Sequence, residues 1–547
     1  MKREILTILC IFGYTNICWA ATPLVGSASQ QHELAGNMMM EQEHILSDTD
    51  KIAERERKSN GRVYISSFIV DTQALQRSLP PPKALLRRYS GRELDIHELQ
   101  QFTQDISLYY RKHGYPAATA FLPRQEIKDG IIAVKVLPGI LDKIILKNNS
   151  QLDDRFVKGF LRNLQSGMLM RSTELETALA NLNGLPGVSA KGIIEAGDEL
   201  GGSSLTVVVE REPVIEGAVY IDNYGGKYSG RYRYGVQLAV SEPFKNGDKF
   251  FVSGMLSNEN MKNYNIGYET AINKNGGRIG FRCAESDYIL GDYFSQAGAV
   301  GTAKTVSVYG SQLLSNASSS NIRMIYGYEH NRLNDELRIF NYSARKSSDV
   351  FYVGFTGSFT ENGSYTGYST VWRAGNLKMR SEEAQLTAEA GGASGSFSKA
   401  NFDLNHIRRL GNLTQLYVFG HGQLAGSNLD SSEQFYLGGA DAVRAYPQGE
   451  AGGDSGYQAT AELRYQTPVK GMSMTLFADV GEVLARKDGN TPDPHRRLAG
   501  WGIGAVYSLN RSLYARLDYA RKIKGESYRS EAENKNGRLW FRLYKLF

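Results

Sequence analysis

The chain has 547 residues and a net charge of +6 at pH 7, with 22% of its residues charged. This length exceeds one typical domain, and so small a net charge gives no electrostatic case for binding nucleic acid. Glycine (58 residues) and tyrosine (32) are abundant and proline (14) is scarce, a composition typical of a transmembrane β-barrel, in which only alternate strand residues face lipid.

Residues 1–20 are predicted to be a secretory signal peptide, because two basic residues precede a short apolar run and Ala20 suits a cleavage site. Removal of this segment takes two of the three cysteines with it. We therefore expect Cys283 to remain as a lone structural thiol on a strand. Residues 21–60 are predicted to form an N-terminal helix and linker, with a wholly disordered linker as the alternative.

Residues 61–213 are predicted to hold two consecutive small α+β domains, because the order β-α-α-β-β occurs twice. The first spans residues 61–138. Its second helix begins with Asp95, and Glu98 three positions later completes a capping-box pattern. The apolar stripe expected on that helix consists of Leu99, Phe102, Ile106 and Tyr109.

The second α+β domain is predicted over residues 139–213. One helix is expected over residues 153–164. Thr173, with Glu176 three residues later, is expected to cap the next helix. Two closing strands complete the unit, and each domain then offers a sheet edge.

From residue 214 the helical period is lost, and residues 214–547 are predicted to form an outer-membrane barrel of about 16 antiparallel strands with no helix. In residues 457–466, for example, Tyr457, Leu463 and Tyr465 share one face, while Glu462 lies on the other. A soluble sandwich also alternates, but this many strands would make it oversized.

The last strand is expected to end at Phe547, which resembles the C-terminal signal by which outer-membrane barrels are recognised for assembly. Leu539, Phe541 and Leu543 share a face with it. Lys545 departs from this apolar face, and we expect its ammonium group to reach the lipid headgroups.

Enzyme chemistry has little support in the sequence. The eight histidines form no zinc-binding pattern, and neither a nucleophile elbow nor a phosphate loop occurs. The glycines of residues 500–504 are interpreted as sites of close packing between strands rather than as a nucleotide loop. We therefore expect no catalytic residue, cofactor or metal, although a lipase-type site inside the barrel stays open as an alternative.

Two motifs stand out in the barrel segment. The first is Val443-Arg444-Ala445-Tyr446, at the centre of a long loop that begins near residue 434. The second lies in residues 474–483, which have a strand pattern. Phe477, Asp479 and Gly481 occupy alternate positions there, and the neighbours of Asp479 are apolar.

In these motifs the chain resembles the transporters of two-partner secretion, the TpsB proteins of the Omp85 superfamily. That family carries VRGY in its sixth loop and FxDxG in a neighbouring strand, and Ala445 replaces the glycine of the first motif. The resemblance implies two POTRA domains, a plug helix before them, and a loop that folds into the barrel and pairs its arginine with the aspartate. We therefore expect Arg444 and Asp479 to hold that loop.

The function that the resemblance implies is secretion of one large partner exoprotein across the outer membrane by a monomeric pore, without ATP. The N-terminal domains would lie in the periplasm and capture the unfolded partner, and the barrel-assembly machinery would insert the protein into lipid. The partner classes are a haemolysin, an adhesin or a contact-dependent growth-inhibition toxin. The alternatives are an Omp85-type factor that inserts other barrels and, beyond that, a passive porin.

Overall fold

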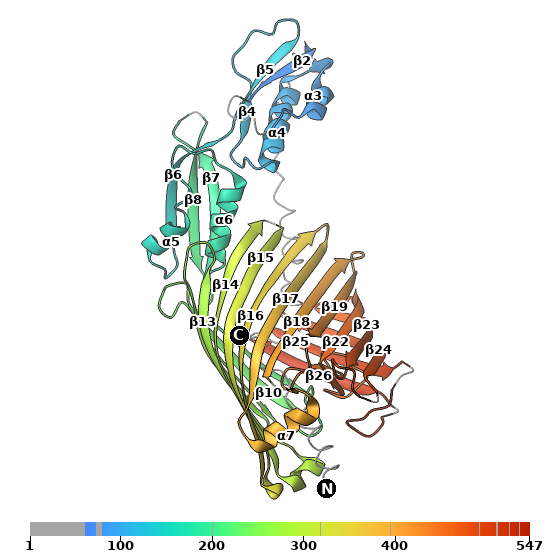
Figure 1. Ribbon diagram of the computed structural model, residues 1–547. Coiled ribbons are helices and arrows are strands. Elements are labelled where there is room, and N and C mark those ends of the chain that lie inside the picture. Colours follow the sequence, from blue (N-terminus) through green and yellow to red (C-terminus); the bar gives the residue numbers. More distant parts are fainter. Residues whose placement is uncertain are drawn as a thin grey trace.

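The computed structural model places two small α/β units before a large closed barrel (Figure 1). The predicted signal peptide and plug helix lie outside the described residues. None of the described helices has the length and apolar composition needed to cross a membrane. The structure describes residues 61–72, 79–199, 201–317, 319–393, 395–491, 493–509, 512–523, 526–534 and 536–547.

The first unit contains a three-stranded sheet in the order β2-β5-β4 and a separate two-stranded sheet, β1-β3. The predicted capping box is confirmed, because the Asp95 carboxylate accepts from the backbone N–H of Glu98 at 2.8 Å and the Glu98 carboxylate accepts from that of Asp95 at 3.0 Å. The three-residue strand β3 was not predicted. The elements are β1 (Val63–Ile65), β2 (Ser67–Asp71), α3 (Lys83–Tyr89), β3 (Arg92–Leu94), α4 (Ile96–Lys112), β4 (Thr119–Phe121) and β5 (Ile131–Leu137).

The core face of α4 differs from the predicted stripe at one position. Leu99, Phe102 and Ile106 are buried as expected, but the fourth member is Tyr110, which is fully buried, and not Tyr109. At about 100° per residue, Tyr110 lies roughly 20° from Leu99 around the helix axis, whereas Tyr109 lies roughly 80° away. Tyr109 therefore packs at the margin of the core.

The second unit has a sheet of order β6-β8-β7 with its helices against one side. The helix predicted over residues 153–164 ends at Phe160. The predicted capping by Thr173 is wrong, because the helix begins at Ser172, two residues earlier than that cap requires, and its N-cap residue Arg171 makes no side-chain cap. The elements are β6 (Ile140–Asn148), α5 (Asp154–Phe160), α6 (Ser172–Asn183), β7 (Val188–Ala196) and β8 (Gly202–Arg211).

The barrel closes with 16 strands, each antiparallel to its neighbours, and β26 pairs with β9. The even count and the antiparallel order agree with the prediction. The strands are β9 (Ile215–Asp222), β10 (Arg233–Ser241), β11 (Lys249–Ser257), β12 (Lys262–Ala271), β13 (Arg278–Ile289), β14 (Ala299–Ala317), β15 (Ser320–Leu337), β16 (Tyr342–Glu361), β17 (Ser364–Met379), β18 (Gly395–Arg409), β19 (Thr414–Ala425), β22 (Ser455–Gln466), β23 (Met472–Leu484), β24 (His495–Leu509), β25 (Leu513–Lys522) and β26 (Arg538–Leu546).

The prediction that this region contains no helix is wrong. The loop between β17 and β18 carries α7 (Glu382–Gly391), whose N-cap Ser381 accepts from the backbone N–H of Ala384 at 3.3 Å. Two short 3-10 helices, Asp292–Ala297 and Arg338–Phe340, lie in other loops at the same end of the barrel. These elements are short and lie between strands, so the two-residue period of the strands conceals them.

Side-chain alternation on the barrel strands follows the predicted pattern. On β22, Tyr457, Leu463 and Tyr465 are 50%, 43% and 48% exposed on the outer face, whereas Glu462 and Arg464 are buried on the lumen face. Apolar side chains outside and charged side chains inside are the arrangement that lipid and a watery lumen require.

The C-terminus completes the barrel wall. Leu539, Leu543 and Phe547 face outward, and the backbone of Phe547 exchanges two hydrogen bonds with Gly217 next to β9. Lys545 also points outward, and its ammonium group donates to Ser512 in the adjacent turn at 3.2 Å.

The turn between β10 and β11 (residues 242–248) packs against the second unit, since a side chain at Gly247 of the turn would meet Leu185 of that unit at 2.7 Å. Within the turn, the buried Glu242 carboxylate accepts from the backbone N–H of Gly247 at 3.1 Å. Burial raises the pKa of Glu242 to about 7; that hydrogen bond and Arg278 oppose the rise, and Asp248 adds to it.

We expect this turn to lose protection as the pH rises. A carboxyl group with a raised pKa in the folded state favours folding below pH 4.5, and that contribution is lost as pH rises to about 7. Hydrogen–deuterium exchange of residues 242–248, corrected for intrinsic rates, should therefore be several-fold faster at pH 8 than at pH 5. The variant Glu242→Gln should not show this change, whereas equal pH dependence in both proteins would contradict the assignment.

Candidate functional site: a loop anchored inside the barrel

The long loop between β19 and β22 (residues 426–454), called the inner loop below, enters the barrel. It carries a short hairpin of β20 (Phe435–Leu437) and β21 (Ala451–Gly453). Loops normally lie at the surface, because a buried backbone needs polar partners. Here the tip is buried, with Val443, Arg444 and Tyr446 at most 3% exposed. Counting loops from β9 at the end of the barrel opposite the α/β units, this is the sixth.

The tip packs into an apolar cluster on the lumen side of the wall. The cluster joins loop residues to side chains of β23, β24, β25 and the loop that follows β25, so contacts from several strands hold the loop in place. Its members are Phe435, Leu437, Val443, Ala445, Tyr446, Ala451, Phe477, Val483, Leu498, Ala520 and Tyr528.

Arg444 and Asp479, the two residues expected to hold the loop, lie in contact. The Arg444 guanidinium donates to both Asp479 carboxylate oxygens, from Nε at 2.9 Å and from Nη2 at 2.7 Å, and the backbone N–H of Arg444 donates to the same group at 3.1 Å. Both side chains are almost wholly buried. This bidentate geometry fixes distance and orientation together.

The pair belongs to a larger charge network that the motifs alone did not indicate. Arg444 Nη1 also donates to Glu462 at 2.7 Å and to Asp518 at 3.2 Å. Arg464 and Arg516 in turn donate to Glu462, and Arg516 also donates to Asp518. Three guanidinium groups thus face three carboxylates, so the network is neutral when all six are ionised. Each carboxylate has more than one donor, which offsets the cost of removing the charges from water.

Two aromatic residues complete the environment of Arg444. Its guanidinium carbon lies 3.3 Å from the ring centroid of Phe477, a close cation–π contact. Trp540 on β26 donates its indole N–H to the Arg444 carbonyl oxygen at 2.7 Å. The loop tip therefore contacts β22, β23, β25 and β26.

Glycines on the lumen face of the strands provide room for the loop. A side chain at Gly481 would collide with Leu437, and one at Gly500 would meet the Cβ atom of Ala445 at 2.5 Å. The interpretation of the 500–504 glycines as packing sites is therefore confirmed. Ala445 does not have a positive φ, so its replacement of the family glycine creates no backbone strain.

A second anchor, also not indicated by the sequence, lies nearer the outside. The fully buried Glu450 pairs with Arg496 of β24 and accepts hydrogen bonds from the backbone N–H groups of Arg529 and Ser530, in the loop between β25 and β26. From the same loop Tyr528 donates its hydroxyl to the Ala445 carbonyl oxygen at 2.6 Å. This outer loop therefore covers the inner loop.

No candidate catalytic or metal centre is evident in the part of the chain that the structure describes. Its histidine, cysteine and carboxylate side chains form no group that could hold a metal ion. Cys283 is a free, half-buried thiol on β13, the position expected of a structural strand residue.

The fold and these contacts define a class: an outer-membrane barrel with a loop anchored in its lumen and two small units of helices and strands on its periplasmic side. The family model described as haemolysin secretion/activation protein ShlB/FhaC/HecB matches residues 201–507, and that of the ShlB-type POTRA domain matches residues 67–139. The chain belongs to this haemolysin secretion/activation family, the transporters of two-partner secretion.

Relatives and solved structures agree with this assignment. The haem/hemopexin transporter protein HuxB of Haemophilus influenzae is 29% identical over 408 residues, which are 73% of this chain and 72% of HuxB. The outer membrane transporter CdiB of Dickeya dadantii is 22% identical over 532 residues, 92% of each chain. The structure of CdiB from Escherichia coli has the same fold, with a TM-score of 0.67 at 18% identity over 95% of this chain and 97% of that one.

Proposed function

We propose that the protein secretes one large partner protein through its barrel, and that its α/β units capture this partner unfolded in the periplasm. The observation that carries the proposal is the presence, in one chain, of periplasmic units with open strand edges and a barrel whose lumen is lined by charged side chains. The inner loop is the part that controls the passage.

The edge strand β2 supports capture by strand addition. Among the described residues, β2 pairs on one side only, with β5. Its Ile69 is 59% exposed. A strand edge binds an extended chain through backbone hydrogen bonds, and an exposed apolar residue adds affinity with little demand on sequence. Both features suit a partner that arrives unfolded.

Movement through the barrel needs no nucleotide in this scheme. A segment that emerges outside and folds there cannot return, because folding removes it from the unfolded population that fits the pore. The lumen has charges of both signs, as in the network around Arg444, and these solvate a polypeptide without binding it irreversibly. The apolar outer face contacts lipid, and the barrel-assembly machinery inserts the protein.

A comparison of culture supernatants and membranes tests the proposal. Deleting the gene should remove one large protein from the supernatant, and supplying the gene again should restore it, with outer-membrane barrels unchanged. A general loss of other barrels would favour the insertion of membrane proteins instead. Loss of a small-molecule flux with unchanged supernatants would favour a porin.

A further inference from the structure

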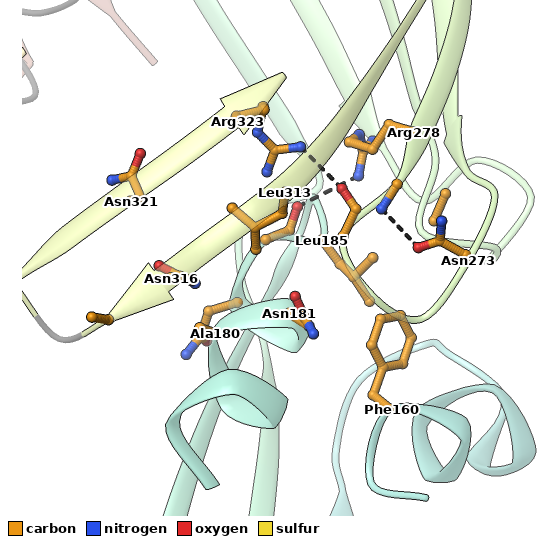
Figure 2. Close-up of a pocket in the computed structure, with 16 residues that line it drawn as sticks. Phe160, Ala180, Asn181, Leu185, Asn273, Arg278, Leu313, Asn316, Asn321 and Arg323 are labelled. Carbon is orange, nitrogen blue, oxygen red and sulfur yellow. Dashed lines mark hydrogen bonds between the residues drawn. The ribbon is translucent and has the colours of Figure 1, made fainter. Parts of the chain in front are cut away.

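A cavity of about 490 Å³ lies where the second unit meets the barrel, within the range of volumes at which proteins bind ligands. One side is the end of α6 and the residues after it, and the other is formed by β13, β14, β15 and the β12–β13 turn (Figure 2). Arg278 and Arg323 contribute from the barrel, on strand positions that face the lumen. The cavity is therefore at the periplasmic mouth.

The cavity contains polar atoms that the fold itself leaves without hydrogen bonds. Asn181 on α6 is 7% exposed, and its side-chain oxygen has no hydrogen-bond partner. Arg278 pairs with Glu269 and donates to the Gly184 carbonyl oxygen, but its Nε–H has no hydrogen-bond partner. Buried polar atoms are usually paired, so a molecule bound in this cavity would gain hydrogen bonds from both atoms.

The chemistry of the lining limits what that ligand is. The lining contains two arginines and five asparagines and no carboxylate. An asparagine side chain carries the same donor and acceptor as a peptide group, so it pairs with a main chain whatever its sequence. The arginines attract carboxylates. Asn183, Asn273 and Asn321 are engaged within the protein, which leaves the unpaired Asn181 oxygen for a main-chain N–H. Together with the arginines it fits an extended peptide segment that carries acidic side chains.

We propose that this cavity binds an acidic, extended segment of the polypeptide in transit as it passes from the second unit into the lumen. The inference rests on the proposed function and adds a site to it. Asn181 accepts from a main-chain N–H of the segment, and Arg278 and Arg323 bind its acidic side chains. Weak, repeated binding at the mouth then favours entry of the chain.

Two variants with matched controls test the site in the full-length protein in detergent. Asn181→Leu removes the unpaired acceptor. Asn263→Leu is its control, because the amide oxygen and nitrogen of Asn263 are also inaccessible and unpaired, but this residue lies on β12 at the opposite end of the barrel. Arg323→Gln removes one charge. Arg282→Gln is its control, because Arg282 is the lumen-facing arginine four residues further along β13 from Arg278.

The probe is a fluorescent peptide of twelve glycine, serine and aspartate residues, compared with the same peptide in which lysine replaces aspartate. Asn181→Leu should weaken binding of the aspartate peptide about threefold to tenfold, the effect of one hydrogen bond. Arg323→Gln should weaken binding of the aspartate peptide by a similar factor. It should also reduce the ratio of the affinities for the aspartate and lysine peptides. Both controls should bind like the parent protein.

Equal binding of both peptides, or equal affinities in all variants, would overturn the site. Such a result leaves the proposed function intact if the parent protein still secretes its partner in cells. Absence of that secretion in the parent strain would instead refute the proposed function, so the two failures are distinguishable.

Discussion

Replacing Arg444 with alanine is expected to stop secretion of the partner while the barrel still folds into the outer membrane. The substitution leaves Asp479, Glu462 and Asp518 facing only two arginines, in a place where all the side chains concerned are nearly inaccessible to water. Stranding a buried charge in this way costs about 3–5 kcal/mol. That cost falls on the inner loop, which is expected to leave its position in the lumen.

Secretion in culture and single-channel conductance of the purified barrel measure this effect. We expect secretion to fall at least tenfold and the conductance to change in size and become noisier, because the loop is no longer fixed. Arg529→Ala is the control, since that side chain is 53% exposed and its ion pairs lie at the surface, where such pairs contribute little. Parent-like secretion by Arg444→Ala would refute the role of the network.

Exchanging the charges of Arg444 and Asp479 is expected to fail as a rescue. In that double variant an aspartate at position 444 would face Glu462 and Asp518, so a new repulsion would replace the attraction that was lost. The pair is better isolated by a double-mutant cycle with Arg444→Ala and Asp479→Ala. We expect a coupling energy of about 1.5–3 kcal/mol, read from the temperature at which the inner loop becomes open to protease.

The sequence was enough to assign some lumen-facing residues to their face, but not to place them next to their partners. Alternation along residues 457–466 puts Glu462 on the inner side, and the same alternation of Leu513, Ala515, Leu517 and Tyr519 with polar residues puts Asp518 there. Both are buried in the structure. It could not show that these two lie at the same height as Asp479, because height depends on strand register and on barrel closure. The resemblance supplied the pairing of Arg444 with Asp479, and only the three-dimensional structure showed the other four members.

The second anchor, at Glu450, was not predicted for the same reason: its contacts join segments that are far apart in the sequence. Glu450 is one acidic residue in a polar loop, and its burial depends on Arg496 from another strand and on the outer loop that covers it. Conversely, the capping box at Asp95 was correctly predicted because all its atoms lie within four residues of one another. The cap predicted at Thr173 spans as few residues and is absent, so a local pattern can be read from the sequence but still needs the helix to begin at the expected residue.

Replacing Asp222 with alanine is expected to weaken the closure of the barrel. The closing pair of strands, β9 and β26, runs only from Asp222 opposite Arg542 to Ala218 opposite Leu546, shorter than any other pair in the barrel. At the end of this pair that lies away from the α/β units, the fully buried Asp222 carboxylate accepts from Arg233 of β10 at 2.7 Å and from Arg542 of β26 at 2.9 Å. One carboxylate thus fixes an arginine on each neighbouring strand.

Loss of that carboxylate leaves two buried guanidinium groups without their main partner, again a cost of about 3–5 kcal/mol. We expect the temperature at which the folded band disappears in semi-native electrophoresis to fall by roughly 10 °C or more. Glu216→Ala on the same strand is the control, because its pair with Lys249 is exposed and its loss should change little. An unchanged transition in Asp222→Ala would mean that backbone pairing alone closes the barrel.

The closing strand pair β9–β26, called the seam below, is linked to the inner loop through Arg542. The Arg542 guanidinium also lies 3.9 Å from the Asp441 carboxylate of that loop. In Asp222→Ala the released guanidinium is expected to turn toward Asp441, so the loop should be held at least as firmly as before. The two variants should therefore differ in their effects. Asp222→Ala should lower the stability of the barrel and keep secretion at low temperature. Arg444→Ala should abolish secretion and keep the barrel closed. Equal loss of secretion in both at low temperature would show that the seam itself takes part in transport.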